Sequence, residues 1–193
     1  MKPGRLALGI AESYRGRNDG TRSTLAGAVV AADRTVDDFA FSSCTVGGED
    51  ATDGIVALWR RLDRPDVRYL FVAGVALAWY NVVRIGRVAE AIDRPVIAVS
   101  FEGSDGLEAG IDDAFEGESR TARLEAYRSL PDRHCLDSAD EPLFFRSAGL
   151  DREEAASVLD AYLYDRRPEP LQVAKRLATR VAAARRDSVF SPE

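Results

Sequence analysis

Three short, largely apolar runs constrain the fold of this chain more than any other feature. They cover residues 6–10, 67–72 and 95–101. Runs of this length suit strands that are buried on both faces of a parallel sheet. Segments with apolar residues at helical spacing, residues 52–62 and 81–92, precede the second and the third run. This alternation of helix and strand predicts a parallel sheet with right-handed crossovers.

Two further runs, residues 25–32 and 36–46, surround the turn-forming pair Asp33-Arg34 and predict an antiparallel hairpin. The five runs together predict an α/β fold with a mixed five-stranded, ribonuclease-H-like sheet flanked by helices. A flavodoxin-like or Rossmann sheet is the alternative, but no Gly-x-Gly-x-x-Gly turn follows the first run, which disfavours dinucleotide binding. A helical C-terminal extension is predicted from the patterns of residues 118–130, 151–162 and 171–186, with a short extra strand at residues 143–147.

A chain of 193 residues fits a single domain, residues 1–193. Its two cysteines, Cys44 and Cys135, form no Cys-x-x-Cys pair, so we expect no closed zinc site. His134, beside Cys135, is interpreted as a loop residue. No apolar run reaches the roughly 18 residues needed to span a bilayer, and charged residues follow the first run, unlike in a secretory signal. We therefore expect a cytoplasmic protein without a membrane partner.

Charge is distributed unevenly along the chain, whose formal net charge is −6. Residues 1–22 contain five basic and two acidic residues, and residues 166–187 contain seven basic and two acidic ones. The middle, residues 23–165, is strongly acidic. Basic termini permit polyanion binding, and an ordinary solvated surface explains them equally well. The abundance of Ala, Asp and Arg over Lys is typical of a salt-adapted, high-GC genome.

Four segments, taken together, resemble one family of proteins. They are residues 8–12 (Leu-Gly-Ile-Ala-Glu), 50–53 (Asp-Ala-Thr-Asp), 74–83 (ending in Asn-Val-Val) and 168–174 (beginning with Pro-Glu-Pro-Leu). Each segment alone is unspecific. Their order and spacing resemble, over almost the whole chain, the archaeal endonuclease V-like family known as domain of unknown function 99.

The resemblance implies an endonuclease of DNA repair that uses Mg²⁺ or Mn²⁺. Such an enzyme cuts a phosphodiester near a deaminated base, and some members resemble deoxyuridine-directed endonucleases. Carboxylates at the ends of neighbouring strands would hold one or two metal ions, which activate a water and stabilise the leaving oxygen.

This chain departs from the family pattern where the pattern places metal ligands. The family has paired aspartates where this chain has Ala11-Glu12, and Asp-Gly where it has Ala73-Gly74. Alanine cannot bind a cation, so we expect weak or absent metal binding and little cleavage. The further departures are Arg84 in place of an Asp, and Gln172 and Lys175 in place of an Arg and a His.

Three acids are candidates for a rebuilt catalytic and metal site: Glu12, Asp50 and Asp53. Glu12 follows the lost aspartate, but neighbouring side chains of a strand face opposite sides unless a bulge or the strand end re-aims them. Asp50 and Asp53 lie at the start of a helix, where Asp50 serves equally well as the helix cap. Glu102 ends the third parallel run and is a further acid near this edge.

Four residues are candidates for contacts with nucleic acid: Tyr80, Asn81, Arg84 and Lys175. An aromatic side chain in the loop after Gly74 can stack on an extruded base, and it can equally pack against the neighbouring helix. Asn81 suits either a base contact or the cap of its own helix. Arg84 and Lys175 supply positive charge for phosphates, and Arg84 is a candidate to fill the emptied cation space.

The sequence thus favours an endonuclease V-like protein with weak or no cleavage. A nuclease with a rearranged Mg²⁺ or Mn²⁺ site remains open. A non-catalytic paralogue that binds nucleic acid or a partner protein is the alternative. A third possibility is a small-molecule enzyme that works at the carboxyl ends of the strands.

Overall fold

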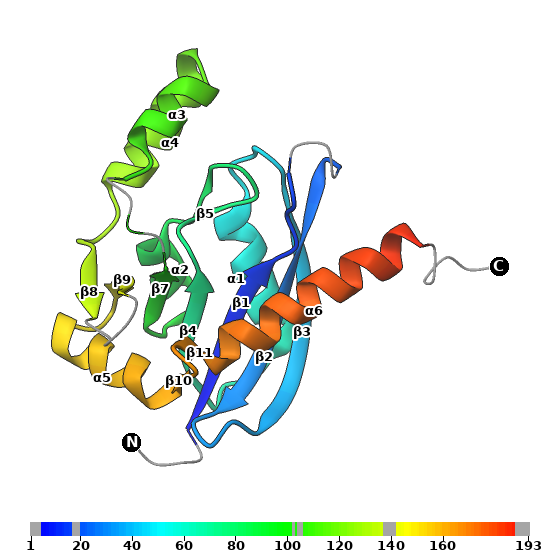
Figure 1. Ribbon diagram of the computed structural model, residues 1–193, viewed down its shortest axis with the longest axis vertical. Coiled ribbons are helices and arrows are strands. Elements are labelled where there is room, and N and C mark those ends of the chain that lie inside the picture. Colours follow the sequence, from blue (N-terminus) through cyan, green and yellow to red (C-terminus); the bar gives the residue numbers. More distant parts are fainter. Residues whose placement is uncertain (1–4, 17–19, 102, 104–105, 137–141, 188–193) are drawn as a thin grey trace.

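The computed structural model describes residues 5–16, 20–101, 103, 106–136 and 142–187. Its centre is a seven-stranded sheet in the order β3-β2-β1-β4-β7-β9-β8 (Figure 1). The strands of this sheet are β1 (Leu6–Glu12), β2 (Arg22–Ala31), β3 (Val36–Thr45), β4 (Val67–Ala73), β7 (Val96–Ser100), β8 (His134–Leu136) and β9 (Leu143–Ala148). Two small antiparallel pairs are β5 (Ala76–Leu77) with β6 (Asn81–Val82), and β10 (Leu163–Tyr164) with β11 (Arg167–Pro168). The helices are α1 (Ala51–Leu62), α2 (Ile85–Ile92), α3 (Glu108–Ala114), α4 (Gly117–Arg128), α5 (Arg152–Tyr162) and α6 (Glu169–Arg186).

The three apolar runs form the central strands, as predicted. Strand β1 is parallel to β4, and β4 is parallel to β7, whereas β2, β3 and β9 are antiparallel to their neighbours. Both faces of the three parallel strands are buried over most of their length, which explains why their sequences are largely apolar rather than alternating; the exception is the exposed Arg68 near the start of β4. Their carboxyl ends, at Glu12, Ala73 and Ser100, therefore lie along one edge of the sheet.

The prediction of five strands was wrong, because two more strands extend the sheet beyond β7. Strand β9 corresponds to the short extra strand expected near residues 143–147. Strand β8 was not predicted, and His134 lies in it rather than in a loop. Three residues are too few for a pattern of alternation, and their strand conformation comes from pairing with β9, where His134 is opposite Phe145.

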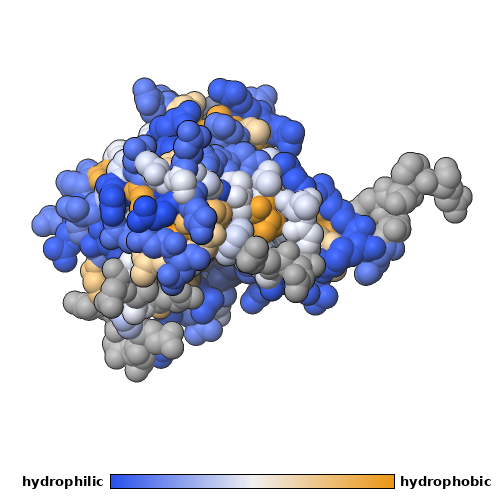
Figure 2. Space-filling view, turned by 90° about the horizontal axis from the view of Figure 1, so that it is seen from above, coloured by the Kyte–Doolittle hydropathy of each residue, from blue (hydrophilic) through white to orange (hydrophobic). Residues whose placement is uncertain are grey.

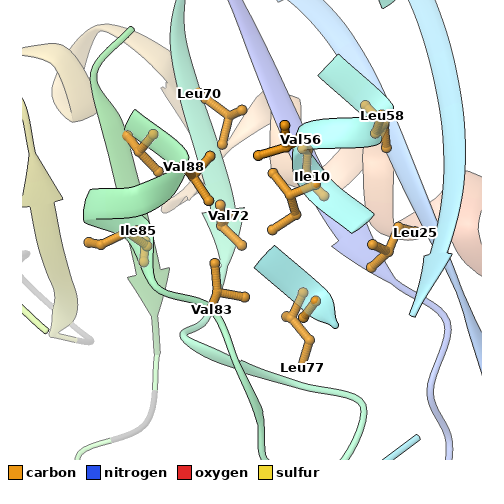
Figure 3. Packing of buried hydrophobic residues seen from close by; sticks show 14 of the residues in the cluster. Ile10, Leu25, Val56, Leu58, Leu70, Val72, Leu77, Val83, Ile85 and Val88 are labelled. Atoms are coloured by element: carbon orange, nitrogen blue, oxygen red, sulfur yellow. The ribbon is translucent and has the colours of Figure 1, made fainter. Parts of the chain in front are cut away.

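Helices cover both faces of the sheet. Helices α1 and α2 pack on one face around Ile10, Leu70 and Val72 (Figure 3). Helices α5 and α6 pack on the other face, where Phe71 and Leu159 belong to one cluster. Helices α3 and α4 project from the body of the molecule (Figure 1). One predicted helix begins later than expected. Its first residues, Asn81 and Val82, form strand β6, and α2 begins at Ile85.

Helix α6 lies directly on strand β1 because Gly9 has no side chain. A Cβ atom placed on Gly9 would lie 2.2 Å from the carbonyl carbon of Pro170 and 2.7 Å from the backbone nitrogen of Leu171. The segment around Gly9 and the segment beginning at Pro168, which are far apart in sequence, thus touch through their backbones. In Figure 1, α6 crosses in front of β1 and β2 from this point.

We predict that Gly9→Ala destabilises the protein by about 1–3 kcal/mol, because the added methyl group meets backbone atoms that cannot rotate away. The matched control is Gly86→Ala in α2, where an added Cβ has nothing within 4 Å. This control should be neutral or stabilising by about 0.4–1 kcal/mol. Urea denaturation of both variants measures the difference, and equal stabilities would contradict the importance of this contact.

Candidate functional site

A pocket of about 720 Å³ opens at the carboxyl ends of the parallel strands. Ala73 and Ser100, at the ends of β4 and β7, line it together with the first two turns of α6. Its acidic lining is limited, within the part of the chain that the structure describes, to Glu12. Its cationic lining consists of Arg133, Arg146, Arg167, Lys175 and Arg176.

The two alanines at the expected metal-ligand positions lie on the α6 side of the sheet. Ala11 is fully buried and packs with Ala28, Val30 and Ala174. Ala73 packs partly against the same cluster and lines the pocket. The two positions where the sequence resemblance led us to expect carboxylates therefore lie next to each other, and both are alanines.

Glu12 lies at the edge of the pocket, but its carboxylate is already engaged. It accepts hydrogen bonds from the Ser23 hydroxyl, at 2.9 Å, and from the backbone N–H of Tyr14. Lys175 donates to the backbone oxygen of Glu12 at 2.7 Å, and its Nζ lies 3.9 Å from Glu12 Oε1. The side chain of Glu12 is only 15% exposed. Glu12 thus lies at the strand ends, and Lys175 lies beside it.

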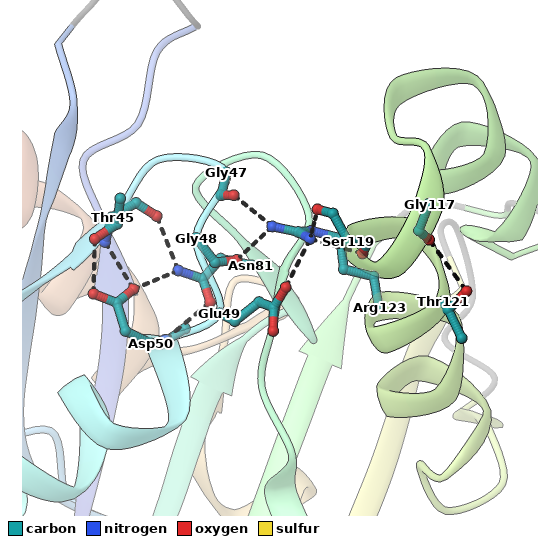
Figure 4. Close-up of polar contacts among 11 residues, drawn as sticks. Thr45, Gly47, Gly48, Glu49, Asp50, Asn81, Gly117, Ser119, Thr121 and Arg123 are labelled. Atoms are coloured by element: carbon teal, nitrogen blue, oxygen red, sulfur yellow. Dashed lines mark hydrogen bonds and ion pairs between the residues drawn. The ribbon is translucent and has the colours of Figure 1, made fainter.

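Asp50 is built into a hydrogen-bond network at the start of α1 (Figure 4). Its carboxylate accepts from the backbone N–H and the hydroxyl of Thr45, at 2.9 and 2.8 Å, and from Asn81 Nδ2 at 2.8 Å. Arg22 lies 3.4 Å away. Burial raises the pKa of Asp50, but the hydrogen bonds from Thr45 and Asn81 outweigh it and hold the pKa below its ordinary value of 3.8. Asp50 occupies the N-cap position of α1 without capping it by its side chain.

The three predicted acids do not form a metal site in the described residues. Asp53 is exposed in the first turn of α1 and has no hydrogen-bond or ion-pair partner in the described part of the chain. Neither Asp50 nor Asp53 lines the pocket. Among the described residues, no group of three or more His, Cys, Asp or Glu side chains is placed to share a metal ion. The donor set therefore does not fit Mg²⁺ or Mn²⁺, which bind several oxygens. Glu102 lies outside the described residues.

Asn81 holds two segments together instead of capping its own helix. Its buried Oδ1 accepts from the backbone N–H of Ala51, the first residue of α1, at 2.9 Å, and its Nδ2 also donates to the carbonyl of Thr45 at 2.9 Å. This contact extends to the α3–α4 hairpin, because Arg123 donates to Glu49 and to the carbonyl of Gly48 (Figure 4). Asn81 is thus a structural residue. The interpretation that it caps its own helix was wrong, because Asn81 lies in β6 and Arg84 is the N-cap residue of α2.

The aromatic residues after Gly74 pack against the hairpin of α3 and α4. The ring of Trp79 lies 4.8 Å from that of Phe115, and the ring of Tyr80 lies 6.1 Å from it, edge on. Tyr80 and Arg84 do not line the pocket. The backbone N–H of Arg84 donates to the Thr52 hydroxyl at 3.0 Å. Of the four residues predicted to contact nucleic acid, the structure places only Lys175 in the pocket.

The sequence interpretation missed the arginines of the pocket. Arg167 and Arg176 belong to the basic C-terminal segment, so its charge was a usable signal. Arg133 and Arg146 lie in the acidic middle of the chain without a local motif, and only the pairing of β9 with β7 brings Arg146 to the pocket. Their recognition needed the fold.

A second, smaller pocket of about 250 Å³ lies at the other end of α6. Arg22, Arg185 and Arg186 supply its cations, and Ser13 and Thr24 are among its polar residues. Helix α6 thus carries positive charge to both pockets. Seen from above, the molecule has a mostly hydrophilic surface with small, separate hydrophobic patches (Figure 2).

The order of strands and the placement of helices define a class of proteins, the mixed α/β fold of endonuclease V. The human endonuclease V structure superposes with a TM-score of 0.65 at 12% identity, covering 96% of this chain and 87% of that one. Ciona intestinalis endonuclease V, solved with a 24mer DNA that contains an inosine followed by a ribo-adenosine, gives a TM-score of 0.62 at 11% identity, covering 93% and 86%. No helix among the described residues has the length and apolar character to cross a bilayer.

The family itself follows from sequence. The model of the endonuclease dU family matches residues 3–182, and this chain belongs to that family. A UPF0215 protein of Pyrobaculum calidifontis is 32% identical over 178 residues, which cover 90% of this chain and 95% of the relative. A crystal structure of a protein of unknown function from Archaeoglobus fulgidus gives a TM-score of 0.80 at 25% identity, covering 92% of this chain and 98% of the other. The resemblance to an archaeal, endonuclease V-like family is confirmed.

We predict that Asp50→Asn lowers the free energy of unfolding at pH 7 by about 1–2 kcal/mol, because an amide cannot accept all of the hydrogen bonds from Thr45 and Asn81. The pKa of Asp50 is lower in the folded protein than its ordinary 3.8. Its contribution is therefore complete above that value and is lost as the pH falls through the folded-state pKa, so the gap to wild type should narrow in acid.

Denaturation curves at pH 7 and in steps down to pH 3 measure this gap. Asp53→Asn is the matched control, since Asp53 lies on the same helix without such partners, and it should cost only about 0.3–1 kcal/mol through the helix dipole. A gap for Asp50→Asn that is constant or grows in acid would show that the charge of Asp50 does not stabilise the fold.

Proposed function

We propose that this chain is an endonuclease V-like protein that binds nucleic acid through its phosphates and cleaves it weakly or not at all. The observation that carries the proposal is the composition of the pocket at the strand ends. Ala11 and Ala73 occupy the positions where the family pattern has metal-binding aspartates, and five cationic side chains line the space beside them. Phosphate oxygens are natural ligands for such a lining.

Electrostatics works against a divalent ion in this pocket. Mg²⁺ and Mn²⁺ prefer carboxylate, carbonyl and water oxygens. Glu12 is the only carboxylate that lines the pocket in the described residues, and Lys175 lies beside it. The fixed positive charges of arginine and lysine repel a metal ion bound in the pocket and attract a bound phosphate.

A nuclease with a rearranged metal site is the second candidate. Glu12 and Asp50 are its candidate ligands. Both carboxylates lie near the buried thiol of Cys44, whose pKa rises to about 12, chiefly through burial and further through these two negative charges. The hydrogen bonds to Ser23 and to Thr45 count against it, since metal binding would have to displace them. Mg²⁺ or Mn²⁺ is the cofactor that this alternative requires.

Two finer assignments belong to the same proposal. The strand order β3-β2-β1-β4-β7 supports the ribonuclease-H-like description of the sheet, with β9 and β8 as an addition at its edge. The four segments that carry the sequence resemblance support the identity of this family with the one known as domain of unknown function 99.

We predict little or no cleavage of strands that contain deoxyuridine or inosine, with Mg²⁺ or Mn²⁺ present, because two metal ligands are lacking. The assay is gel electrophoresis of labelled strands with the wild type, with Ala11→Asp/Ala73→Asp and with Asp50→Ala/Asp53→Ala. The restored aspartates should raise metal affinity in a calorimetric titration. Because Ala11 is fully buried, an aspartate there also lowers stability, so the melting temperature of this variant must be measured as well.

The Asp50→Ala/Asp53→Ala variant separates the two candidates. Robust cleavage by the wild type that disappears in this variant, while its folding is retained, would overturn the proposal and establish the rearranged nuclease. Wild-type cleavage that survives in this variant would overturn the proposal too, and would place the chemistry elsewhere.

We also predict that binding of a single strand weakens with added salt, and that Arg176→Gln reduces the slope of log affinity against log salt concentration by about 0.7, the value for one phosphate contact. Arg176 lines the pocket and forms no ion pair with any residue that the structure describes. Arg87→Gln is the control, because Arg87 is exposed on α2, which packs on the opposite face of the sheet. Equal slopes for the two variants would place the phosphate contacts outside the pocket.

A further inference from the structure

The pocket combines two kinds of lining that suit one kind of ligand. Its cations gather with two partly exposed aromatic side chains, Phe101 and Tyr127, whereas the third aromatic residue of the lining, Phe145, is buried. Its volume of about 720 Å³ lies within the range of small-molecule sites, roughly 300–1,000 Å³. A surface for the backbone of a long polyanion needs positive charge alone, whereas a pocket with aromatic side chains in its walls also accommodates a flat ring.

Aromatic rings hold the guanidinium groups in position. The guanidinium of Arg167 lies 4.5 Å from the ring centre of Phe101, and that of Arg146 lies 5.3 Å from the ring centre of Tyr127. Arg146 also donates to the Tyr127 hydroxyl at 3.3 Å. Neither arginine forms an ion pair with a described residue. A stacked guanidinium keeps N–H groups in its plane for a planar or tetrahedral anion, and no carboxylate has to be displaced from it.

The balance of charge indicates an anion that carries more than one charge. Among the described residues, the lining contains one carboxylate, Glu12, which Ser23 and the backbone of Tyr14 already bind. The same lining contains the cations Arg146, Arg167, Lys175 and Arg176. A phosphodiester carries one negative charge, whereas a phosphomonoester carries about 1.5 to 2 at pH 7 and has three strong acceptor oxygens. A phosphomonoester is therefore attracted more strongly to the cations of this lining than a phosphodiester is.

We propose that the pocket binds the phosphomonoester of a nucleotide, with the phosphate held by Arg146, Arg167 and Arg176 and the base against the aromatic walls. This inference rests on the proposed function, in that it assigns the same pocket to phosphate, and it adds the ligand class: a terminal phosphate rather than an internal phosphodiester. The nucleotide is either free or the phosphorylated end of a strand, and the two sources share this chemistry.

The first experiment uses isothermal titration of the full chain with adenosine 5′-monophosphate, adenosine and inorganic phosphate. The monophosphate should bind at least about tenfold more tightly than either part alone, because it uses both linings at once. Arg146→Gln/Arg167→Gln should weaken the monophosphate by about tenfold or more. Arg87→Gln should leave its affinity unchanged, and melting temperatures establish that each variant is folded. Equal affinities for adenosine and its monophosphate, or an unchanged affinity in the double variant, would overturn the inference.

The second experiment distinguishes the sources and separates this inference from the proposed function. Fluorescence polarisation compares one single strand with a 5′-phosphate, with a 3′-phosphate, with neither, and in circular form. If a strand with a phosphorylated end binds more tightly than the others, the ligand is the end of a strand. If the monophosphate binds tightly and the strands show no such preference, the ligand is a free nucleotide. If the circular strand binds and the monophosphate does not, the inference fails and the proposed function stands. If the monophosphate binds and no strand does, the pocket assignment stands and the proposed nucleic-acid function fails.

Discussion

The backbone contact between Gly9 of β1 and Pro170 of α6 is the constraint on which the site depends. It brings the first turn of α6 as close to the sheet as two backbones can approach. From this point the helix covers Ala11 with Ala174 and carries Lys175 and Arg176 across the strand ends. A larger residue at position 9 would lift the helix and open the space that now forms the pocket. Backbone contacts, and not the side chains at positions 11 and 73, therefore place α6 on the sheet.

A second constraint acts on the opposite side of the strand ends. Ala78, Trp79 and Tyr80 all have left-handed backbone conformations, with φ of 40°, 63° and 57°. Such conformations cost about 1–3 kcal/mol each for residues with side chains, so surrounding contacts must stabilise them. The backbone N–H of Gly47 donates to the carbonyl of Ala78 at 2.8 Å, and Trp79 stacks near Phe115. The turn presents Asn81 to α1, and the Asp50 network follows from it. Asp50 and Asn81 thus hold elements of the fold together, although the sequence presented both as candidates for a functional site.

The sequence predicted the central parallel strands well and the site poorly, for different physical reasons. Burial on both faces leaves a continuous apolar run, as in residues 6–11 of β1, and such a run identifies its strand without further context. Strand β8 has no such signal, because its conformation depends on its partner β9. Glu12 was a candidate for the metal site and Lys175 a candidate for contacts with nucleic acid, and both line the pocket. Arg146 was not, because its place depends on a pairing between strands that lie more than forty residues apart in sequence. The role of Asp50 was ambiguous in the sequence, because an aspartate at the start of a helix can serve either as a metal ligand or as a hydrogen-bond acceptor that stabilises the fold.

The loss of carboxylates and the presence of arginines in the pocket act in the same electrostatic direction. A divalent ion about 5 Å from one lysine is repelled by about 6–7 kcal/mol at an effective dielectric constant of about 20, and a phosphate dianion gains a similar amount. Aspartates at positions 11 and 73 would oppose this repulsion, and alanines do not. Aspartates without metal would instead repel each other and the phosphate. Each set of residues is therefore favourable only with its own ligand: carboxylates with a metal ion, arginines with an anion. In the described part of the chain the pocket has mainly the second set: Glu12 is its one carboxylate there, and Lys175 lies beside it. Conversion of this pocket into a metal site consequently requires removal of cations as well as addition of carboxylates.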